Sequence, residues 1–293
     1  MGVNIQTIKD IRLYLSEQLY GIYQDPEISA LTNIIIKTVT GITKLHHLAL
    51  TEQHISEINS IKIIKICNEL KSGKPIQYIL GETNFYNCII KLNSDTLIPR
   101  PETEELVDLI IKENRGFKGT ILDIGTGSGC IAIALTMNLP GASVSGFDIS
   151  EGALKIAGEN SRLNKVSVSF FRADIFSFDH TTNIKTDIIV SNPPYVRDLE
   201  KKFMSSNVID FEPHLALFVH DNDPLLYYRA ILELARKILT DGGKIYFEIN
   251  EAFGKEVAEL LKFFGYSDIS IVKDINDKAR IIKGIKDAGK SSV

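Results

Sequence analysis

An apolar run that ends in two prolines lies in the second half of the chain and reads Thr186-Asp187-Ile188-Ile189-Val190-Ser191-Asn192-Pro193-Pro194-Tyr195. Its β-branched centre, Ile188 to Val190, predicts a buried strand. A residue before a proline avoids the helical region, and two successive prolines fix φ and remove two N–H donors. The stretch therefore predicts a strand that stops in a stiff turn, at the carboxyl edge where open α/β sheets bind their ligands.

This turn offers acceptors that suit a planar amino group. The side-chain carbonyl of Asn192 and the backbone carbonyl of Pro193, which Pro194 leaves without a local N–H partner, could hold both hydrogens of an –NH2 group and aim its lone pair. The ring of Tyr195 adds a flat face, and acceptors and ring would stabilise positive charge on the nitrogen. A turn that merely ends a strand explains the same residues equally well.

Composition sets the broad class of the protein. The chain has 293 residues and a formal net charge of -4, which fits one large or two smaller domains and no broad nucleic-acid-binding surface. Its three cysteines, Cys67, Cys88 and Cys130, form no C-x-x-C pair, so neither a disulfide framework nor a zinc site is expected.

The remaining features of composition point to the cytoplasm. His46, His47 and His54 lack accompanying thiols or carboxylates, so no metal site is predicted. No signal peptide and no membrane-spanning run is found. We expect a cytoplasmic protein.

The first 75 residues read as amphipathic helices. Apolar residues recur at spacings of three and four in two stripes, Ile5, Ile8, Ile11, Leu15, Leu19 and then Ile28, Leu31, Ile35, Val39. We expect Asp25 to cap the second helix, Pro26 to be its first residue and Gly41 to end it. Thr51 is a candidate cap for a further helix. Because residues 1–75 show no reactive cluster, we expect a small helical domain that docks the substrate.

Residues 76–98 differ in character from the helical part. Aromatic and β-branched residues, broken by glycine and asparagine, predict a β-hairpin that links two domains. The segment that follows, Pro99-Arg100-Pro101-Glu102-Thr103-Glu104, has the proline and the acids of a helix start. A wall of the active site, formed by Arg100 to Thr103, is an equally good interpretation of the same residues.

A glycine-rich turn follows the strand predicted over residues 120–124. It reads Asp123-Ile124-Gly125-Thr126-Gly127-Ser128-Gly129, and an apolar helix begins at Cys130. Glycines let a backbone approach a ligand closely. The spacing G-x-G-x-G differs from the G-x-G-x-x-G of dinucleotide sites. Asp123, at the end of the strand, would face a cationic amine better than a pyrophosphate.

An acidic residue also lies at or just after the end of each of the next two predicted strands. Asp148 follows Gly129 by about twenty residues, which is near the spacing at which an acid binds a ribose diol. The loop and Asp148 together predict a nucleoside site, although a purely structural loop is still compatible with the motif. Asp174 either accepts from the exocyclic amine of a base, with Ile175 packed on the ring, or simply starts a loop.

The order of strands and helices predicts the fold. Strands are expected at residues 120–124, 144–148, 166–171, 188–190, 242–248, 269–272 and 280–286, with a helix over 225–239 before the fifth strand. Alternating strands and helices indicate a mostly parallel sheet that is covered on both faces. We therefore expect an α/β fold for the second part of the chain.

The glycine loop and the Asn-Pro-Pro-Tyr turn together resemble S-adenosylmethionine-dependent methyltransferases that act on adenine, guanine or glutamine. The choice among them depends on Pro75-Ile76-Gln77-Tyr78-Ile79-Leu80-Gly81, Phe85, Leu97 to Glu104, and Phe211-Glu212-Pro213 followed by Ala216-Leu217. With these segments the chain resembles the peptide chain release factor glutamine methyltransferases, the PrmC/HemK family, from about Pro75 to Gly284. Ile175 stands where an aromatic residue often packs on the adenine.

The resemblance implies an architecture. A Rossmann-like, seven-stranded methyltransferase domain would occupy residues 99–293, after an all-α domain at 1–75 and a hairpin linker at 76–98. The cofactor would be S-adenosyl-L-methionine. The substrate would be the glutamine of the Gly-Gly-Gln motif in release factors, so the activity would modulate translation termination. We expect a monomer with no direct nucleic-acid or membrane partner.

The resemblance also implies roles for individual residues. Carried over by position, Gly125, Thr126, Gly127, Ser128, Gly129, Asp148, Ile175 and Asn192 bind S-adenosylmethionine, and Asn192, Pro193, Pro194 and Tyr195 bind and activate the glutamine. By their own positions, Asp123 and Asp174 join the cofactor site, and Arg100 and Glu102 join the substrate site.

Three other functions are compatible with parts of the sequence. A nucleic-acid amino-methyltransferase should carry a basic face or a target-recognition insertion. A dinucleotide-dependent oxidoreductase should have the longer glycine spacing. A non-catalytic partner of the termination machinery would have no need of the intact Asn-Pro-Pro-Tyr.

Overall fold

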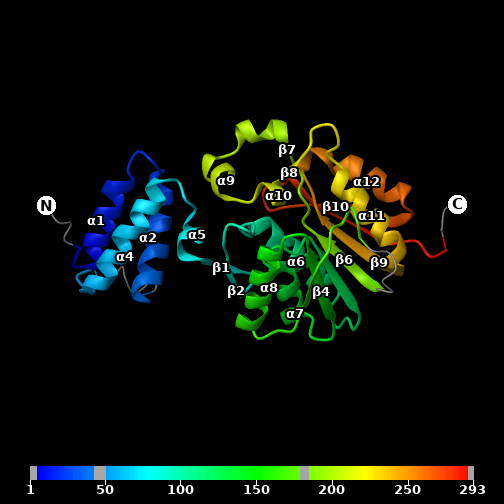
Figure 1. Ribbon diagram of the computed structural model, residues 1–293, viewed down its shortest axis with the longest axis horizontal. Coiled ribbons are helices and arrows are strands. Elements are labelled where there is room, and N and C mark those ends of the chain that lie inside the picture. Colours follow the sequence, from blue (N-terminus) through cyan, green and yellow to red (C-terminus); the bar gives the residue numbers. More distant parts are fainter. Residues whose placement is uncertain (1–4, 43–50, 179–184, 290–293) are drawn as a thin grey trace. The chain divides into compact units, whose positions relative to one another are not determined.

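The computed structural model describes residues 5–42, 51–178 and 185–289, and divides the chain into two compact units at the boundary between Leu80 and Gly81. His46 and His47 lie outside the described residues. Figure 1 shows a helical first unit and a second unit built on a sheet.

The first unit consists of packed helices with a core of their own. Its helices are α1 (Ile8–Leu19), α2 (Asp25–Thr40), α4 (Glu57–Lys71) and α5 (Ile76–Leu80). The apolar stripes predicted from the spacing face this core, where Ile8, Ile11, Leu15 and Leu19 are all 0% exposed. Burial of such stripes is the main source of stability for short helices in water.

The helix caps differ in detail from those expected. Gln24 is the N-cap of α2, so Asp25 is the first helical residue and Pro26 the second. Gly41 ends α2 with φ of 74°, as predicted. The cap of α4 is Ser56, whose hydroxyl accepts from the backbone N–H of Asn59, and Thr51 lies in a turn. Propensity alone did not separate these neighbouring polar residues.

The second unit contains three sheets and the helices that cover the largest of them. Its strands are β1 (Glu82–Phe85), β2 (Cys88–Lys91), β3 (Thr120–Ile124), β4 (Ser143–Asp148), β5 (Ser169–Arg172), β6 (Thr186–Ser191), β7 (Val196–Arg197), β8 (Phe218–Val219), β9 (Leu239–Glu248), β10 (Tyr266–Lys273) and β11 (Ala279–Lys286). Its helices are α6 (Pro101–Glu113), α7 (Cys130–Asn138), α8 (Glu151–Leu163), η1 (Asp198–Phe203), α9 (Ser206–Phe211), α10 (His214–Leu217), α11 (Leu226–Ile238), η2 (Glu251–Phe253) and α12 (Gly254–Phe263).

The main sheet has seven strands in the order β10-β11-β9-β6-β3-β4-β5. The five strands from β9 to β5 run parallel, whereas β11 is antiparallel to both β9 and β10. The predicted seven-stranded, mostly parallel sheet is therefore confirmed. The strand β5 starts later than predicted, at Ser169, because Lys165 adopts φ of 57° and Val166 donates to the carbonyl of Ser161 to close α8.

Helices cover both faces of the main sheet (Figure 1). Leu122 and Ile124 alternate along β3 and join the buried cluster that includes α11 and α12. Because successive strand residues point to opposite faces, Ile121 and Asp123 point to the other face, where α6, α7 and α8 pack. The carboxyl ends of β3, β4, β5 and β6 meet at one edge of the sheet.

The hairpin β1–β2 lies within the second unit. Its two-residue turn is Tyr86 and Asn87, with φ of 43° and 65°, as a tight hairpin turn requires. Side-chain amides of α8 bind the free edge of β2: Asn164 accepts from and donates to the backbone of Ile89, and Asn160 does the same with Lys91. Asn160, which is fully buried, also donates to the carbonyl of Ser128 in the glycine loop.

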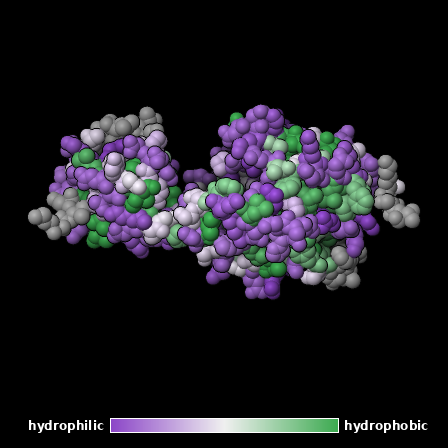
Figure 2. Space-filling model, turned by 90° about the horizontal axis from the view of Figure 1, so that it is seen from above, coloured by the Kyte–Doolittle hydropathy of each residue, from purple (hydrophilic) through white to green (hydrophobic). Residues whose placement is uncertain are grey.

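On the face that Figure 2 views, hydrophilic residues predominate and hydrophobic residues form small patches. Within the three described ranges, no helix has the length and apolar character needed to cross a membrane.

Candidate functional site

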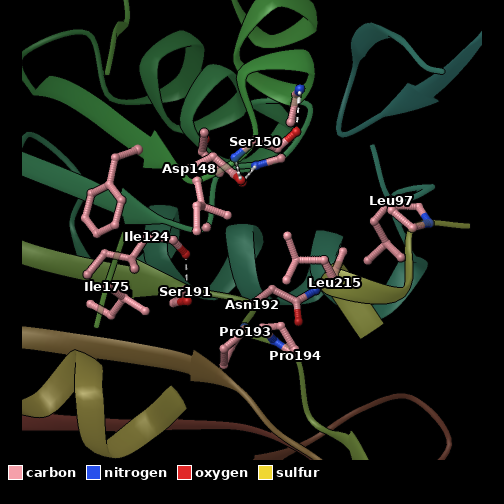
Figure 3. Close-up of a pocket in the computed structure, with 18 of the residues that line it drawn as sticks. Leu97, Ile124, Asp148, Ser150, Ile175, Ser191, Asn192, Pro193, Pro194 and Leu215 are labelled. Atoms are coloured by element: carbon pink, nitrogen blue, oxygen red, sulfur yellow. Dashed lines mark hydrogen bonds between the residues drawn. The ribbon is translucent and has the colours of Figure 1, made fainter. Parts of the chain in front are cut away.

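A pocket of about 490 Å³ opens at the carboxyl edge of the main sheet. Residues that follow β3, β4, β5 and β6 line it, together with residues of α10 and α11. In Figure 3, Asp148 and Ser150 lie on one side of the pocket and Asn192, Pro193 and Pro194 on the opposite side. The sheet therefore brings together the nucleoside and amine motifs, which the sequence separates by more than forty positions.

The glycine loop approaches the pocket with backbone rather than side chains. Gly125 and Gly127 have φ of 71° and 54°, and a Cβ added to either would meet nothing within 4 Å. Gly129 has φ of 79°, and a Cβ there would lie 2.9 Å from the ring of Phe170. The first two glycines leave open space for a ligand, and the third allows α7 to start close against the sheet.

Asp148 is fixed by backbone donors from two segments. The N–H of Gly127 donates to Oδ2 at 2.8 Å, and the N–H of Ser150 donates to Oδ1 at 2.9 Å. Each oxygen keeps a further lone pair, and Asp148 lines the pocket. The carboxylate is thus held in place to accept from two adjacent hydroxyl groups, as a ribose diol would require.

Asp123 does not line the pocket. Its side chain is fully buried beneath the loop, where Oδ2 accepts from the Thr126 hydroxyl at 2.6 Å. Burial raises the pKa of Asp123 to about 7, against the lowering effect of the Thr126 hydrogen bond, and the Asp148 carboxylate raises the pKa further. Its Oδ1 atom has no hydrogen-bond partner among the described residues. The expected contact with a cationic amine stays a prediction.

The far end of the pocket is suited to a flat ring. Asp174 and Ile175 both line it, and Asp174 also accepts from the N–H of Phe176 in a local turn. The ring of Phe176 lies 5.2 Å from that of Tyr227, a pocket residue on α11. Sequence reasoning missed this aromatic pair because Tyr227 lies about fifty positions beyond Asp174 and carries no motif of its own.

The proline turn places Asn192, Pro193 and Pro194 in the pocket lining. The Nδ2 group of Asn192 donates to the hydroxyl of Thr103 at 3.2 Å. Thr103 is a buried residue in the first turn of α6 and donates in turn to Oε2 of Glu248 at 2.6 Å. An amide bound through its nitrogen leaves its carbonyl oxygen available to a ligand.

Tyr195 is not among the residues that line the pocket. Its hydroxyl donates to Oε1 of Glu248 at 2.9 Å, and its ring packs against the sheet core. Burial raises the pKa of Tyr195 well above its usual value, and the neighbouring Glu248 raises it further. The predicted stacking face for a substrate therefore stays a prediction, and no pattern in the sequence predicted the partner of the hydroxyl.

Glu248, at the end of β9, is 1% exposed and was not predicted as a site residue. Burial raises its pKa, while hydrogen bonds from Thr103 and Tyr195 and the positive charge of Arg280 lower it. The only sequence signal was an acid at the end of a predicted strand, which Asp123 and Asp148 share.

Arg100 forms an ion pair with Glu212, whose side chain is buried, and Glu212 also accepts from the backbone N–H of Ile98 at 3.1 Å. Of the predicted wall from Arg100 to Thr103, Thr103 lines the pocket, whereas Arg100 and Glu102 do not. The contacts of Arg100 and Glu102 with a substrate stay predictions. The ion pair ties the segment before α6 to the segment before α10, where Pro213 lines the pocket, and Leu215 on α10 lines it too.

The fold is that of the class I methyltransferases. The methyltransferase small domain family matches residues 102–211. A solved methyltransferase structure from Pyrococcus furiosus superposes with a TM-score of 0.52 at 16% identity, covering 79% of this chain and all of that one.

Comparison with curated relatives identifies the family of methyltransferases to which the chain belongs. The chain is 46% identical over 280 residues to the release factor glutamine methyltransferase of Flavobacterium psychrophilum, covering 94% of this chain and 98% of that protein. It is 45% identical over 272 residues to the enzyme of the same name from Bacteroides thetaiotaomicron, covering 93% and 98%. It is also 36% identical to that of Bacillus subtilis, covering 83% and 86%. The chain belongs to the release factor glutamine methyltransferase family.

Proposed function

We propose that this protein transfers a methyl group from S-adenosylmethionine to the side-chain amide nitrogen of the glutamine in the Gly-Gly-Gln motif of a peptide chain release factor. The observation that carries the proposal is the pocket itself, where the Asp148 carboxylate lies opposite the Asn192 amide. A nucleoside acceptor and an amine-orienting turn in one cavity suit the transfer of a group from a nucleoside cofactor to a planar amino group.

The residues of the pocket fit this cofactor. Gly125 and Gly127 leave open space at the loop, and Asp148 is held with free lone pairs for the ribose hydroxyls. We propose that Asp174, Ile175 and the ring of Tyr227 contact the adenine. We also propose that Asp123, buried beneath the loop, lies near the cationic end and becomes negatively charged as the pH rises through about 7. When bound, the cofactor supplies an electrophilic methyl group on a sulfonium.

The turn would orient the acceptor nitrogen. In the proposed complex, Asn192 and the carbonyl of Pro193 each accept one hydrogen of the glutamine amide, which aims the nitrogen at the methyl group. The amide lone pair is delocalised, so the nitrogen is a poor nucleophile. Acceptors fixed in advance stabilise the positive charge that develops on it. The proton can leave after the methyl group has been transferred, so the scheme requires no strong base.

Mass spectrometry tests the proposal directly. The protein is incubated with S-adenosylmethionine and a bacterial release factor, and the modified residue is mapped by fragmentation. We expect one added methyl group on the Gly-Gly-Gln glutamine, and none when that glutamine is replaced by glutamate. Methylation of RNA but of no release factor would favour a nucleic-acid methyltransferase instead.

We further propose that the helical first unit docks the release factor. Several large apolar side chains on it are exposed, among them Tyr20 at 78%, Ile58 at 67% and Ile61 at 61%. Residues 81–293 alone should bind the cofactor but lose turnover on the intact release factor. If this shorter protein methylates the release factor as fast as the full chain does, the docking role is wrong.

A further inference from the structure

A chain of hydrogen bonds connects the pocket to a buried carboxylate behind it. Asn192 donates to Thr103, and Thr103 donates to Glu248, at 3.2 and 2.6 Å. Tyr195 donates to the other oxygen of Glu248 at 2.9 Å. Thr103 and Glu248 are 2% and 1% exposed, and Thr103 is also part of the pocket lining.

The direction of each bond in this chain follows from the chemistry of its last member. Each oxygen of Glu248 accepts a hydrogen bond from a hydroxyl donor, Oε2 from Thr103 and Oε1 from Tyr195. The single proton of the Thr103 hydroxyl is thereby committed to Glu248. Only the lone pairs of that hydroxyl remain for Asn192, so Thr103 can accept the amide –NH2 and has no proton to give to the amide carbonyl.

We propose that Glu248 acts through Thr103 as a positioning residue, which fixes the Asn192 side-chain amide with its carbonyl oxygen toward the substrate nitrogen. The role rests on the function proposed above. Neither Thr103 nor Glu248 needs to touch the reacting atoms, because their effect is to remove the alternative orientation of the Asn192 amide.

That alternative orientation would prevent productive binding. Flipping the terminal amide of an asparagine exchanges its oxygen and its nitrogen and hardly changes its shape. The flipped amide presents N–H donors at the position of the oxygen. The substrate is itself an –NH2 group, so two donors would face each other in a site shielded from water. An unpaired buried donor is costly, and the acceptor that should stabilise positive charge would be lost.

Isosteric variants separate the orienting role from packing. Thr103→Val removes the hydroxyl and keeps the shape, whereas Thr103→Ser keeps the hydroxyl. Glu248→Gln keeps the shape but introduces a donor, which one hydroxyl must then accept. Thr136→Val is the matched control, because Thr136 on α7 donates only to the backbone carbonyl of Ala132 and does not line the pocket.

Single-turnover methylation of a release factor at saturating cofactor should fall about tenfold to a hundredfold in Thr103→Val and in Glu248→Gln. The Kd for S-adenosylmethionine should not change. Thr103→Ser should recover most of the rate, and Thr136→Val should keep it. Circular dichroism and thermal melting check that each variant folds.

A second measurement needs no turnover. In protein carrying ¹⁵N-labelled asparagine, the side-chain amide resonance of Asn192 reports its hydrogen bond in the free protein. We expect that resonance to shift in Thr103→Val and in Glu248→Gln and to stay in place in Thr103→Ser.

The outcomes distinguish this inference from the proposed function. If Thr103→Val keeps both the wild-type rate and the Asn192 resonance, or if Thr103→Ser loses as much rate as Thr103→Val, the positioning role is wrong. If the wild-type protein methylates no release factor, the proposed function fails. In that case the Asn192 resonance alone decides whether Glu248 and Thr103 orient the amide.

Discussion

The two sides of the pocket are held in place by different means. On the loop side, backbone N–H groups of Gly127 and Ser150 fix the carboxylate of Asp148, and all three lie within a short strand–helix–strand unit. On the turn side, the amide of Asn192 is fixed by the side chain of Thr103, which lies 89 positions away in the sequence. Thr103 in turn bonds to Glu248, which lies 145 positions from Thr103 in the sequence.

This difference has a consequence for substitution. A backbone donor is supplied by any residue that adopts the right conformation, so the loop side depends mainly on glycine φ angles. A side-chain donor or acceptor is lost with a single replacement, and its buried partner is then left unpaired. The loop side should therefore govern cofactor affinity, and the turn side should govern the rate of transfer.

The largest effect is expected at Asn192, where Asn192→Ala removes one acceptor for the substrate amide and lets it rotate out of line. Loss of one such contact costs about 2.7–4 kcal/mol, which is roughly a hundredfold to a thousandfold in rate. Single-turnover methylation at saturating cofactor measures it. Asn138→Ala is the control, because Asn138 bonds only to the carbonyl of Ala134 on α7. A near-wild-type rate in Asn192→Ala would mean that the turn is only structural.

A smaller effect, of a different kind, is expected at Asp148. Asp148→Ala removes the proposed acceptor of the ribose hydroxyls, and hydrogen bonds to a charged group are worth about 1.5–3 kcal/mol. Calorimetry should show an S-adenosylmethionine Kd weaker by about tenfold or more. The transfer rate at saturating cofactor should change much less. A variant that binds normally but transfers slowly would reverse the assignment of the two sides.

At Tyr195, a conservative substitution should lower the stability of the fold. Tyr195→Phe keeps the ring but removes the donor to Oε1 of Glu248, and leaving such a buried group unpaired costs about 1–3 kcal/mol. Denaturation in urea measures the loss. Tyr86→Phe is the matched control, because its hydroxyl bonds to the half-exposed carboxylate of Asp108 and should cost less. Equal stability of the wild type and Tyr195→Phe would show that Glu248 does not need this donor.

At Asp123, the expected effect is a change of stability with pH. The usual pKa of an aspartate is about 3.9, and burial raises the pKa of Asp123 to about 7. Between these values the folded protein holds a proton that the unfolded chain releases. This contribution to the free energy of unfolding is complete below about pH 4 and is lost as the pH rises to about 7, by at most about 1.4 kcal/mol per pH unit.

Asp123→Asn removes the titrating group. The difference in unfolding free energy between the wild type and this variant should decline over that pH range when urea denaturation is repeated at several pH values. A difference that is constant with pH would show that Asp123 is already ionised in the folded protein.

The sequence predicted the parts of the site that depend on local contacts better than the parts that depend on distant ones. The strand, the glycines and Asp148 of the loop side are neighbours in the chain, and periodicity and spacing predicted them closely. The Asn-Pro-Pro turn was predicted for the same reason. Thr103 and Glu248 were not connected to it, because no local pattern says which residues of two remote segments will meet. Arg100 was assigned to the substrate, and its contact with Glu212 again joins two segments that lie far apart.

The asparagines of α8 show how a helix can take the place of a strand. Residues 89 and 91 on one edge of β2 are about 6.6 Å apart, two strand steps, and Asn160 and Asn164 are one helical turn apart, about 6 Å along the axis. The spacing of the two asparagines nearly matches the spacing of the two strand residues. Each side-chain amide can therefore both donate and accept, as the backbone of a neighbouring strand would. A short hairpin edge that would otherwise attract the strand of another molecule is thus closed by two side chains, which protects it from aggregation.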